Sequence, residues 1–212
     1  NFPIVRIYGG LKGSGTHDDA IRHMLDCMGH IHFVESEEAK QNLIKFGEEP
    51  WRIFVCGISH LDDIELDYSS CPAQPYAVVL MNPVTISRDQ TVMDCMVAMD
   101  EAKRFVDETR GYVVVLPPNG DLYSDSVLNV IHSRTRFIGS KALVYDERML
   151  RDKFLALLEK CAYFISNSSA TKYEFPVVNP HGDVYNPSWR NQERTKPPKL
   201  ESGGSDKIIQ ML

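Results

Sequence analysis

The chain of 212 residues carries 43% hydrophobic residues and a formal net charge of −6 at pH 7. This length suits one domain or two small ones, and the apolar fraction is sufficient for a buried core. The acidic balance argues against a general nucleic-acid binder, because neutralising a phosphate backbone requires clustered Lys and Arg. Local phosphate binding by backbone amides at helix starts stays open.

Cysteine usage and hydropathy narrow the class further. The five cysteines are scattered and none forms a C-x-x-C pair, which predicts neither a disulfide framework nor a zinc site. No apolar run approaches the roughly 20 residues of a membrane span, and no signal peptide is visible. We therefore expect a soluble, cytoplasmic protein with no membrane partner. The chain begins at Asn1 inside an apolar segment, as expected for a fragment of a longer protein.

The first part of the chain alternates short apolar runs with helical patterns. A helix is predicted over 18–29, with an inward stripe of Ile21, Met24, Leu25 and Met28. Ser36 can cap a second helix that begins with Glu37 and Glu38 and ends at Gly47. Apolar runs predict strands at 3–8, 30–34 and 52–57.

After a Pro-containing stretch at 65–75 the alternation resumes, and the break predicts a domain boundary there. Strands are predicted at 76–81, 112–117, 163–167 and 176–179, and helices at 88–108, 124–133 and 147–161. Such alternation favours parallel sheets covered by helices on both faces. We expect domains at 1–68 and 72–180, followed by an irregular polar tail over 181–212 that is rich in Pro and Gly.

Four polar clusters directly follow predicted strands: "GGLKGSGTHDD", "NPVT" (82–85), "PNGD" (118–121) and "NSSATKYE" (167–174). In open α/β sheets, ligands bind beyond the carboxyl ends of the strands. Each cluster alone can be an ordinary turn. Four at equivalent places favour a binding site.

The residue types in these clusters allow specific roles. Asp18 or Asp19 can cap the helix that starts there, and the other can serve as a general acid or base. Arg22 and His23 in the first turn can face an anion or solvent. Ser168 and Ser169 can present hydroxyls and amides to a phosphate or merely shape a turn, and Glu174 can hold a ribose diol.

Several other motifs are missing. There is no G-x-x-x-x-G-K-[ST] loop, and "GGLKGSG" lacks the G-x-G-x-x-G spacing of a dinucleotide site. His30 and His32 alternate within a strand, but no further ligands suggest a zinc site.

Together, in this order, the clusters resemble the hydrolysing UDP-N-acetylglucosamine 2-epimerases of sialic-acid biosynthesis. "GTHDDAIRHMLDCMGHIHFVESEE" is similar to the family's G-[TA]-I-D-D-S-I-R-H segment and the strand after it. "RIFVCGISHLDDI", "NPVT" for H-P-V-T, "LPPNGD" for F-P-N-x-D and "NSSATKYE" for N-S-S-x-x-x-x-E follow. The resemblance covers roughly residues 3–178.

The resemblance implies an α/β fold with two Rossmann-like parallel-sheet domains of GT-B type, the first incomplete. It implies a UDP-sugar ligand, no cofactor or metal, and a homo-oligomer such as a dimer or tetramer. Asp18 would act as acid or base near the sugar, and Arg22 and His23 would lie at the substrate. The UDP moiety would be contacted by Asn119, Ser168, Ser169 and Glu174.

The chain departs from the family pattern at places that matter for chemistry. Asn82 stands where the family has a catalytic histidine, and an amide cannot shuttle a proton near neutral pH. "RIYGGL" replaces H-I-x-G-G-E, so Arg6 stands for the histidine and Leu11 for the glutamate. Arg190, Gln192 and Arg194 fall in the region of the family's G-x-R-Q-x-G-R loop without a clean alignment.

Three functions therefore stay in view. The first is a hydrolysing UDP-N-acetylglucosamine 2-epimerase. The second is a degenerate, non-catalytic relative that binds a UDP-sugar or serves as a partner subunit. The third is another GT-B enzyme acting on a related UDP-sugar.

Overall fold

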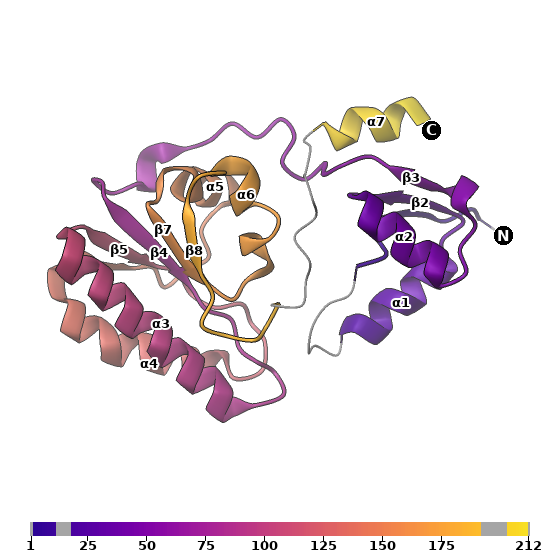
Figure 1. The fold of residues 1–212 in the computed structure, drawn as a ribbon. Helices are drawn as coiled ribbons and strands as arrows, with labels where there is room; N and C mark the ends of the chain where they lie inside the picture. Colours follow the sequence, from indigo (N-terminus) through magenta and orange to yellow (C-terminus); the bar gives the residue numbers. More distant parts are fainter. Residues whose placement is uncertain (1, 12–17, 192–202, 212) are drawn as a thin grey trace. The chain divides into compact units, whose positions relative to one another are not determined.

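The computed structural model describes residues 2–11, 18–191 and 203–211. The chain forms two compact units, which are described separately below (Figure 1). Unit 1 comprises Asn1–Ile64 together with Glu193–Leu212, and unit 2 comprises Glu65–Gln192. The division falls just before the Pro-containing stretch of the sequence.

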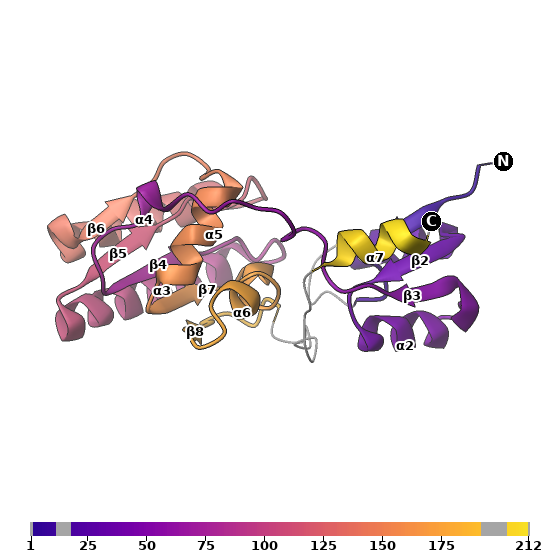
Figure 2. The same ribbon diagram turned by 90° about the horizontal axis from the view of Figure 1, so that it is seen from above.

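Unit 1 is built on a parallel three-stranded sheet in the order β1 (Val5–Ile7), β2 (Ile31–Val34) and β3 (Ile53–Val55). The helices α1 (Asp18–Met28) and α2 (Glu37–Lys45) connect the strands, with η1 (Pro50–Arg52) before β3. Successive side chains of β2 point to opposite faces. Val34 packs with Leu43 of α2, whereas Phe33 packs with Ile208 of the C-terminal helix α7 (Gly204–Met211). The sheet is therefore covered on both faces, as Figure 2 shows.

The cap of α2 is as predicted. Ser36 has extended backbone and its hydroxyl accepts a hydrogen bond from Ala39 N at 3.2 Å. Glu37 and Glu38 follow in the first turn, where the helix dipole favours negative charge. Gly47, with φ +102°, takes the left-handed conformation just beyond the helix.

The predicted inward stripe of α1 is wrong. Its four apolar residues, Ile21, Met24, Leu25 and Met28, are all exposed, whereas Asp26 is only 3% exposed. The helix turns this carboxylate toward β1, where it accepts hydrogen bonds from Gly10 N and Arg6 Nε. Apolar spacing identified the helix correctly but not the side that faces the sheet.

Unit 2 contains a five-stranded, fully parallel sheet in the order β6-β5-β4-β7-β8. Its strands are β4 (Tyr76–Leu80), β5 (Tyr112–Val115), β6 (Ala142–Val144), β7 (Tyr163–Ser166) and β8 (Asp183–Tyr185). α3 (Arg88–Thr109) and α4 (Ser124–Ile138) cover one face, and α5 (Arg151–Lys160) and α6 (Phe175–Val178) cover the other (Figure 1). Short 3-10 turns are η2 (Tyr68–Ser70), η3 (Gly139–Lys141) and η4 (Ser169–Thr171).

The expectation of an irregular tail over 181–212 is wrong for two segments. β8 pairs with β7 at the sheet edge, and α7 packs on unit 1. A three-residue strand has too little apolar pattern to be seen in sequence. The carboxylate of Asp62 holds the start of α7 by accepting hydrogen bonds from Gly203 N (2.6 Å) and Ser205 N (2.9 Å).

Residues 176–179 do not form the predicted strand, because Phe175–Val178 makes the helical turn α6. A run of four apolar residues fits either structure, and Pro176 suits a first helical turn. No helix among the described residues is long and apolar enough to cross a membrane.

Candidate functional site

Asparagine side chains join the loops at the carboxyl edge of the unit 2 sheet. Asn167, after β7, accepts a hydrogen bond from Asn82 N through Oδ1 (2.7 Å) and donates to Asn82 O through Nδ2 (2.8 Å). Asn82, after β4, in turn accepts from Asn119 N through its own Oδ1 (2.9 Å). The loops after β4, β5 and β7 are thus held together by two buried amides.

The side chain of Asn119 takes no part in the hydrogen bond that its backbone N–H makes with Asn82. Its Nδ2 donates to Asp121, while its Oδ1 is buried and accepts no hydrogen bond from the described residues. A buried acceptor without a donor is costly unless a ligand or water satisfies it. Asn119 Oδ1 is therefore a ready acceptor for a ligand N–H or O–H.

The segment after β7 forms a compact turn at the same edge. Ser166 Oγ donates to Leu80 O and accepts from Ser168 N, and the Ser168 hydroxyl caps η4 by accepting from Ala170 N at 3.3 Å. Ser169 begins η4 and is half-buried. The Ser168 side chain thus shapes the turn.

Glu174 precedes α6 and is also half-buried. Its carboxylate lies 3.7 Å from the guanidinium of Arg151. A carboxylate can in general accept hydrogen bonds from two hydroxyl donors.

The residues after β8 belong to this edge as well, which the sequence did not reveal. Asn191 is buried and donates through Nδ2 to Asn167 O at 2.7 Å. Arg190 places its guanidinium 3.7 Å from the Asp121 carboxylate. Gln192 and Arg194 lie outside the described residues. A motif of ordinary polar residues gives no signal of such pairing before the fold is known.

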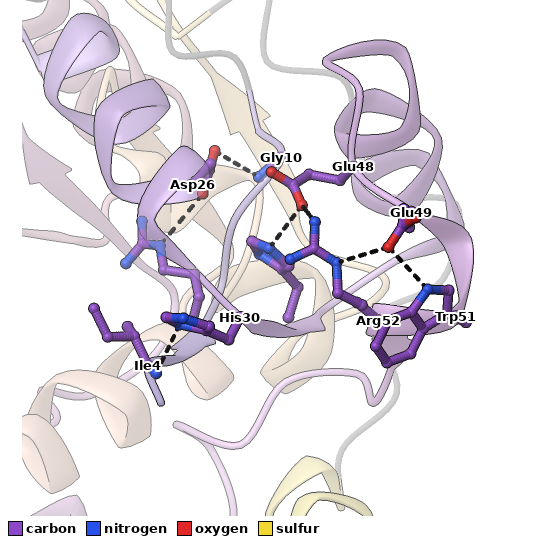
Figure 3. Close-up of polar contacts among 10 residues, drawn as sticks. Ile4, Gly10, Asp26, His30, Glu48, Glu49, Trp51 and Arg52 are labelled. Carbon is purple, nitrogen blue, oxygen red and sulfur yellow. Dashed lines mark hydrogen bonds and ion pairs between the residues drawn. The ribbon is translucent and has the colours of Figure 1, made fainter. Parts of the chain in front are cut away.

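Unit 1 has its own cavity of about 360 Å³ at the carboxyl end of β1, lined by Arg6, Leu11, Arg22 and Asp26 among others. Asp26 holds the glycine loop by accepting from Gly10 N at 3.1 Å and from Arg6 Nε at 3.3 Å (Figure 3). Its charge is therefore already paired. Arg22 forms no hydrogen bond or ion pair within the described part of the chain, so this cavity presents a cation to an anionic ligand.

The other two predicted residues of α1 lie differently. Asp18 is the first residue of α1. His23 is half-buried, and its ring meets the edge of Phe46 with centroids 4.7 Å apart. His23 is thus packed against the end of α2.

Tyr8 links the loop after β1 to the loop after β3. Its hydroxyl lies 2.7 Å from Ser59 Oγ and accepts from Ser59 N at 2.5 Å. His60 Nδ1 lies 3.3 Å from the same oxygen. Tyr8 has φ +59°, a conformation that non-glycine residues adopt at some energetic cost.

Glu35, which directly follows β2, is a functional candidate that sequence reasoning missed. The residue is 3% exposed, and neither carboxylate oxygen accepts a hydrogen bond from another described residue. Burial raises the pKa of Glu35 to about 7; a contact with its own backbone N–H and the charge of Arg22 oppose the rise, while Asp26 and Glu38 add to it. The only signal in the sequence is a glutamate just after a buried strand.

The two alternating histidines, His30 just before β2 and His32 within it, have different partners and do not form one site. His32 is fully buried with Nε2 3.5 Å from Glu48, which also accepts from Arg52 Nη2 at 2.6 Å (Figure 3). His30 is exposed and accepts from Ile4 N at 3.0 Å. Their contacts brace the strand.

Two units that each contain a fully parallel sheet covered by helices define an α/β architecture of GT-B type. The solved UDP-N-acetylglucosamine 2-epimerase of Methanocaldococcus jannaschii, in complex with UDP-GlcNAc and UDP, matches 99% of this chain with TM-score 0.68 at 11% identity. The match covers 68% of that chain, and at this identity it establishes the shared fold.

Sequence comparison narrows the class to a family. The family model for UDP-N-acetylglucosamine 2-epimerase matches residues 1–180, so the chain belongs to this family. It is 28% identical over 193 residues to the polysialic acid biosynthesis protein P7 of Escherichia coli. It is 27% identical over 195 residues to the hydrolyzing UDP-N,N'-diacetylbacillosamine 2-epimerase of Legionella pneumophila. Both alignments use 84% of this chain, which spans about half the length of these relatives (47% and 50%).

Proposed function

We propose that this protein is a hydrolysing 2-epimerase that converts UDP-N-acetylglucosamine to N-acetylmannosamine and UDP. The observation that carries the proposal is the amide-braced edge of unit 2. There Asn82 and Asn167 lock the loops that follow three neighbouring strands, within a chain that belongs to the 2-epimerase family. A preorganised edge of this kind binds a ligand without first ordering its loops.

The UDP moiety is assigned to unit 2. Asn119 Oδ1 offers an unused acceptor. Ser168 caps the η4 turn, and the backbone N–H and hydroxyl of Ser169 can meet phosphate oxygens. Glu174 holds the ribose, because a carboxylate can accept hydrogen bonds from both hydroxyls of a diol.

The sugar chemistry is assigned to unit 1. Elimination removes the proton on C2 and expels UDP from C1, which gives a 2-acetamidoglucal; water then adds to C1. Asp18 acts as a proton-transfer group, and Arg22 and His23 contact the substrate. Arg22 in particular can offset the charge that develops on the leaving diphosphate.

A non-catalytic UDP-sugar binder is the second candidate, and Asn82 favours it. Its side chain occupies the family's histidine position, and its carbonyl oxygen is engaged by Asn119 N. Such a side chain contributes to the loop structure and not to proton transfer. In this reading the protein binds UDP without releasing it from a UDP-sugar.

Two measurements separate these readings. Titration calorimetry with UDP tests binding, and no heat of binding at millimolar UDP would remove both. UDP release from UDP-N-acetylglucosamine then tests turnover, with a 6-deoxy-2,4-diacetamido UDP-sugar assayed in parallel, since one relative is named for such a substrate. Binding without release would leave the non-catalytic reading alone.

A further inference from the structure

Glu35 stands out among the buried acids of the described residues because neither oxygen of its carboxyl group accepts a hydrogen bond from another described residue. Buried carboxyls in folded proteins are normally hydrogen-bonded, and one that is not lowers stability. Asp26 shows the normal case, since Gly10 N and Arg6 Nε satisfy it. Both oxygens of Glu35 accept nothing from any other described residue. A buried ionisable group that is kept at a cost to stability is characteristic of functional sites.

The location of Glu35 agrees with a functional role. It comes directly after β2, and the Gly9–Gly10 loop follows β1; the two strands are parallel neighbours, so both lie at the same edge of the sheet. Arg22 and Asp26 line the cavity beside β1, and both influence the charge state of Glu35. Glu35 itself does not line the cavity, and it follows β2 at the same sheet edge as the Gly9–Gly10 loop that does.

The proposed reaction requires a second proton-transfer group, which the other residues at this edge of the sheet do not supply. The product is the C2 epimer of the substrate, so the proton removed from one face of C2 must be replaced from the opposite face. Two proton-transfer groups are required, and Asp18 supplies one. Leu11 and Asn82 cannot carry a proton, and Asp26 is held by its two partners.

We propose that Glu35 is the second proton-transfer group, a general acid that protonates C2 during hydration of the 2-acetamidoglucal. This inference rests on the proposed function. As the water oxygen bonds to C1, the electron pair of the C1–C2 double bond takes the proton from the Glu35 carboxyl. The proton lost by the water returns to the resulting carboxylate, so the acid is restored and the sugar gains one water. A buried carboxyl whose pKa lies near neutrality is suited to this exchange.

The test compares Glu35→Gln, Glu35→Asp and the unchanged protein in UDP release and in formation of the epimerised sugar. Glu35→Gln preserves shape and hydrogen-bonding size but cannot donate an acid proton. We expect its kcat for formation of the epimerised sugar to fall on the order of 100-fold or more, with KM and UDP affinity changed by less than about threefold, and partial recovery in Glu35→Asp. Asp94→Asn, a carboxyl equally buried at 3% but on α3 of unit 2, is the matched control and should keep full activity.

The pH dependence of kcat distinguishes proton transfer by Glu35 from a purely structural role, which would not change it. In the unchanged protein, kcat should decrease as pH rises through about 7, because the acid loses its proton, and this decrease should be absent in Glu35→Gln. Turnover of Glu35→Gln within threefold of the unchanged protein, with the same pH profile, overturns the inference and leaves the proposed function standing. No UDP release by the unchanged protein overturns both, and calorimetry on the same samples then shows whether UDP binding survives.

Discussion

Asn82 Oδ1 accepts the backbone N–H of Asn119 at 2.9 Å, so a side chain from the loop after β4 fixes the loop after β5. Asn82→Ala leaves that N–H without its acceptor in a nearly buried place. We expect the free energy of unfolding to fall by about 1–3 kcal/mol and UDP affinity to fall as well, because the loops are no longer held together. Chemical denaturation and calorimetry measure the two effects.

Asn119→Ala is the complementary change, because the brace uses the backbone of Asn119 and not its side chain. Stability should stay within about 1 kcal/mol of the unchanged protein, while the loss of the free acceptor Oδ1 weakens UDP binding by roughly tenfold. Equal affinity for UDP in Asn119→Ala would remove this oxygen from the proposed UDP site.

The buried Glu35 carboxyl predicts how stability changes with pH. Because its pKa is raised from 4.5 to about 7, the folded protein keeps a proton that the unfolded chain loses. The free energy of unfolding should therefore fall as pH rises from about 5 to 7 and level off above that, by on the order of 3 kcal/mol. Glu35→Gln should remove this slope, whereas Glu37→Gln, an exposed neighbour, should retain it. Identical slopes in all three proteins would contradict the assigned pKa.

The burial of Ile208 predicts how much the packing of α7 on the rest of unit 1 contributes to the free energy of unfolding. It is 7% exposed and packs with Phe33 and Cys56, whereas the adjacent Ile209 is 72% exposed. Ile208→Ala should lower the free energy of unfolding by about 2–4 kcal/mol, and Ile209→Ala should change it by no more than about 0.5 kcal/mol. Urea unfolding of the two variants makes the comparison, and equal losses would show that α7 is not docked through Ile208.

Glu174 provides a charge-specific test of the UDP assignment. Glu174→Gln keeps the size of the side chain but weakens its acceptance of two hydroxyl hydrogen bonds, so UDP affinity should fall about tenfold. Glu159→Gln on α5 removes the same charge at a carboxylate that accepts from Tyr68, and it should leave UDP affinity unchanged. Calorimetry of the unchanged protein and of Glu174→Gln, with UDP and with 2'-deoxy-UDP, shows whether the lost binding free energy comes from the ribose hydroxyls.

The sequence predicted the alternation of strands and helices because that pattern is carried by local apolar spacing. It could not predict which face of α1 points inward, since the decisive contact joins Asp26 to Gly10 and Arg6 across 16 and 20 residues. The same limit applies to β8 and α7, whose partners β7 and Phe33 are distant along the chain.

The candidate site shows a similar division. Asn82, Asn119 and Ser168 were recognisable because they follow strands in a fixed order. Glu35 was not, because a glutamate after a strand looks like any surface residue until its burial and its lack of partners are known. The roles of the predicted residues in binding and catalysis stay predictions.

The attachment of α7 to unit 1 has a consequence for synthesis on the ribosome. Unit 2 is one uninterrupted stretch of chain and can fold as soon as it has emerged. Most of unit 1 precedes unit 2 in the chain, yet the sheet face that carries Phe33 is covered only after Ile208, which follows unit 2, has been synthesised. The order of completion is thus the reverse of the order of synthesis, and until α7 arrives the nascent chain carries an uncovered apolar surface that chaperones can recognise.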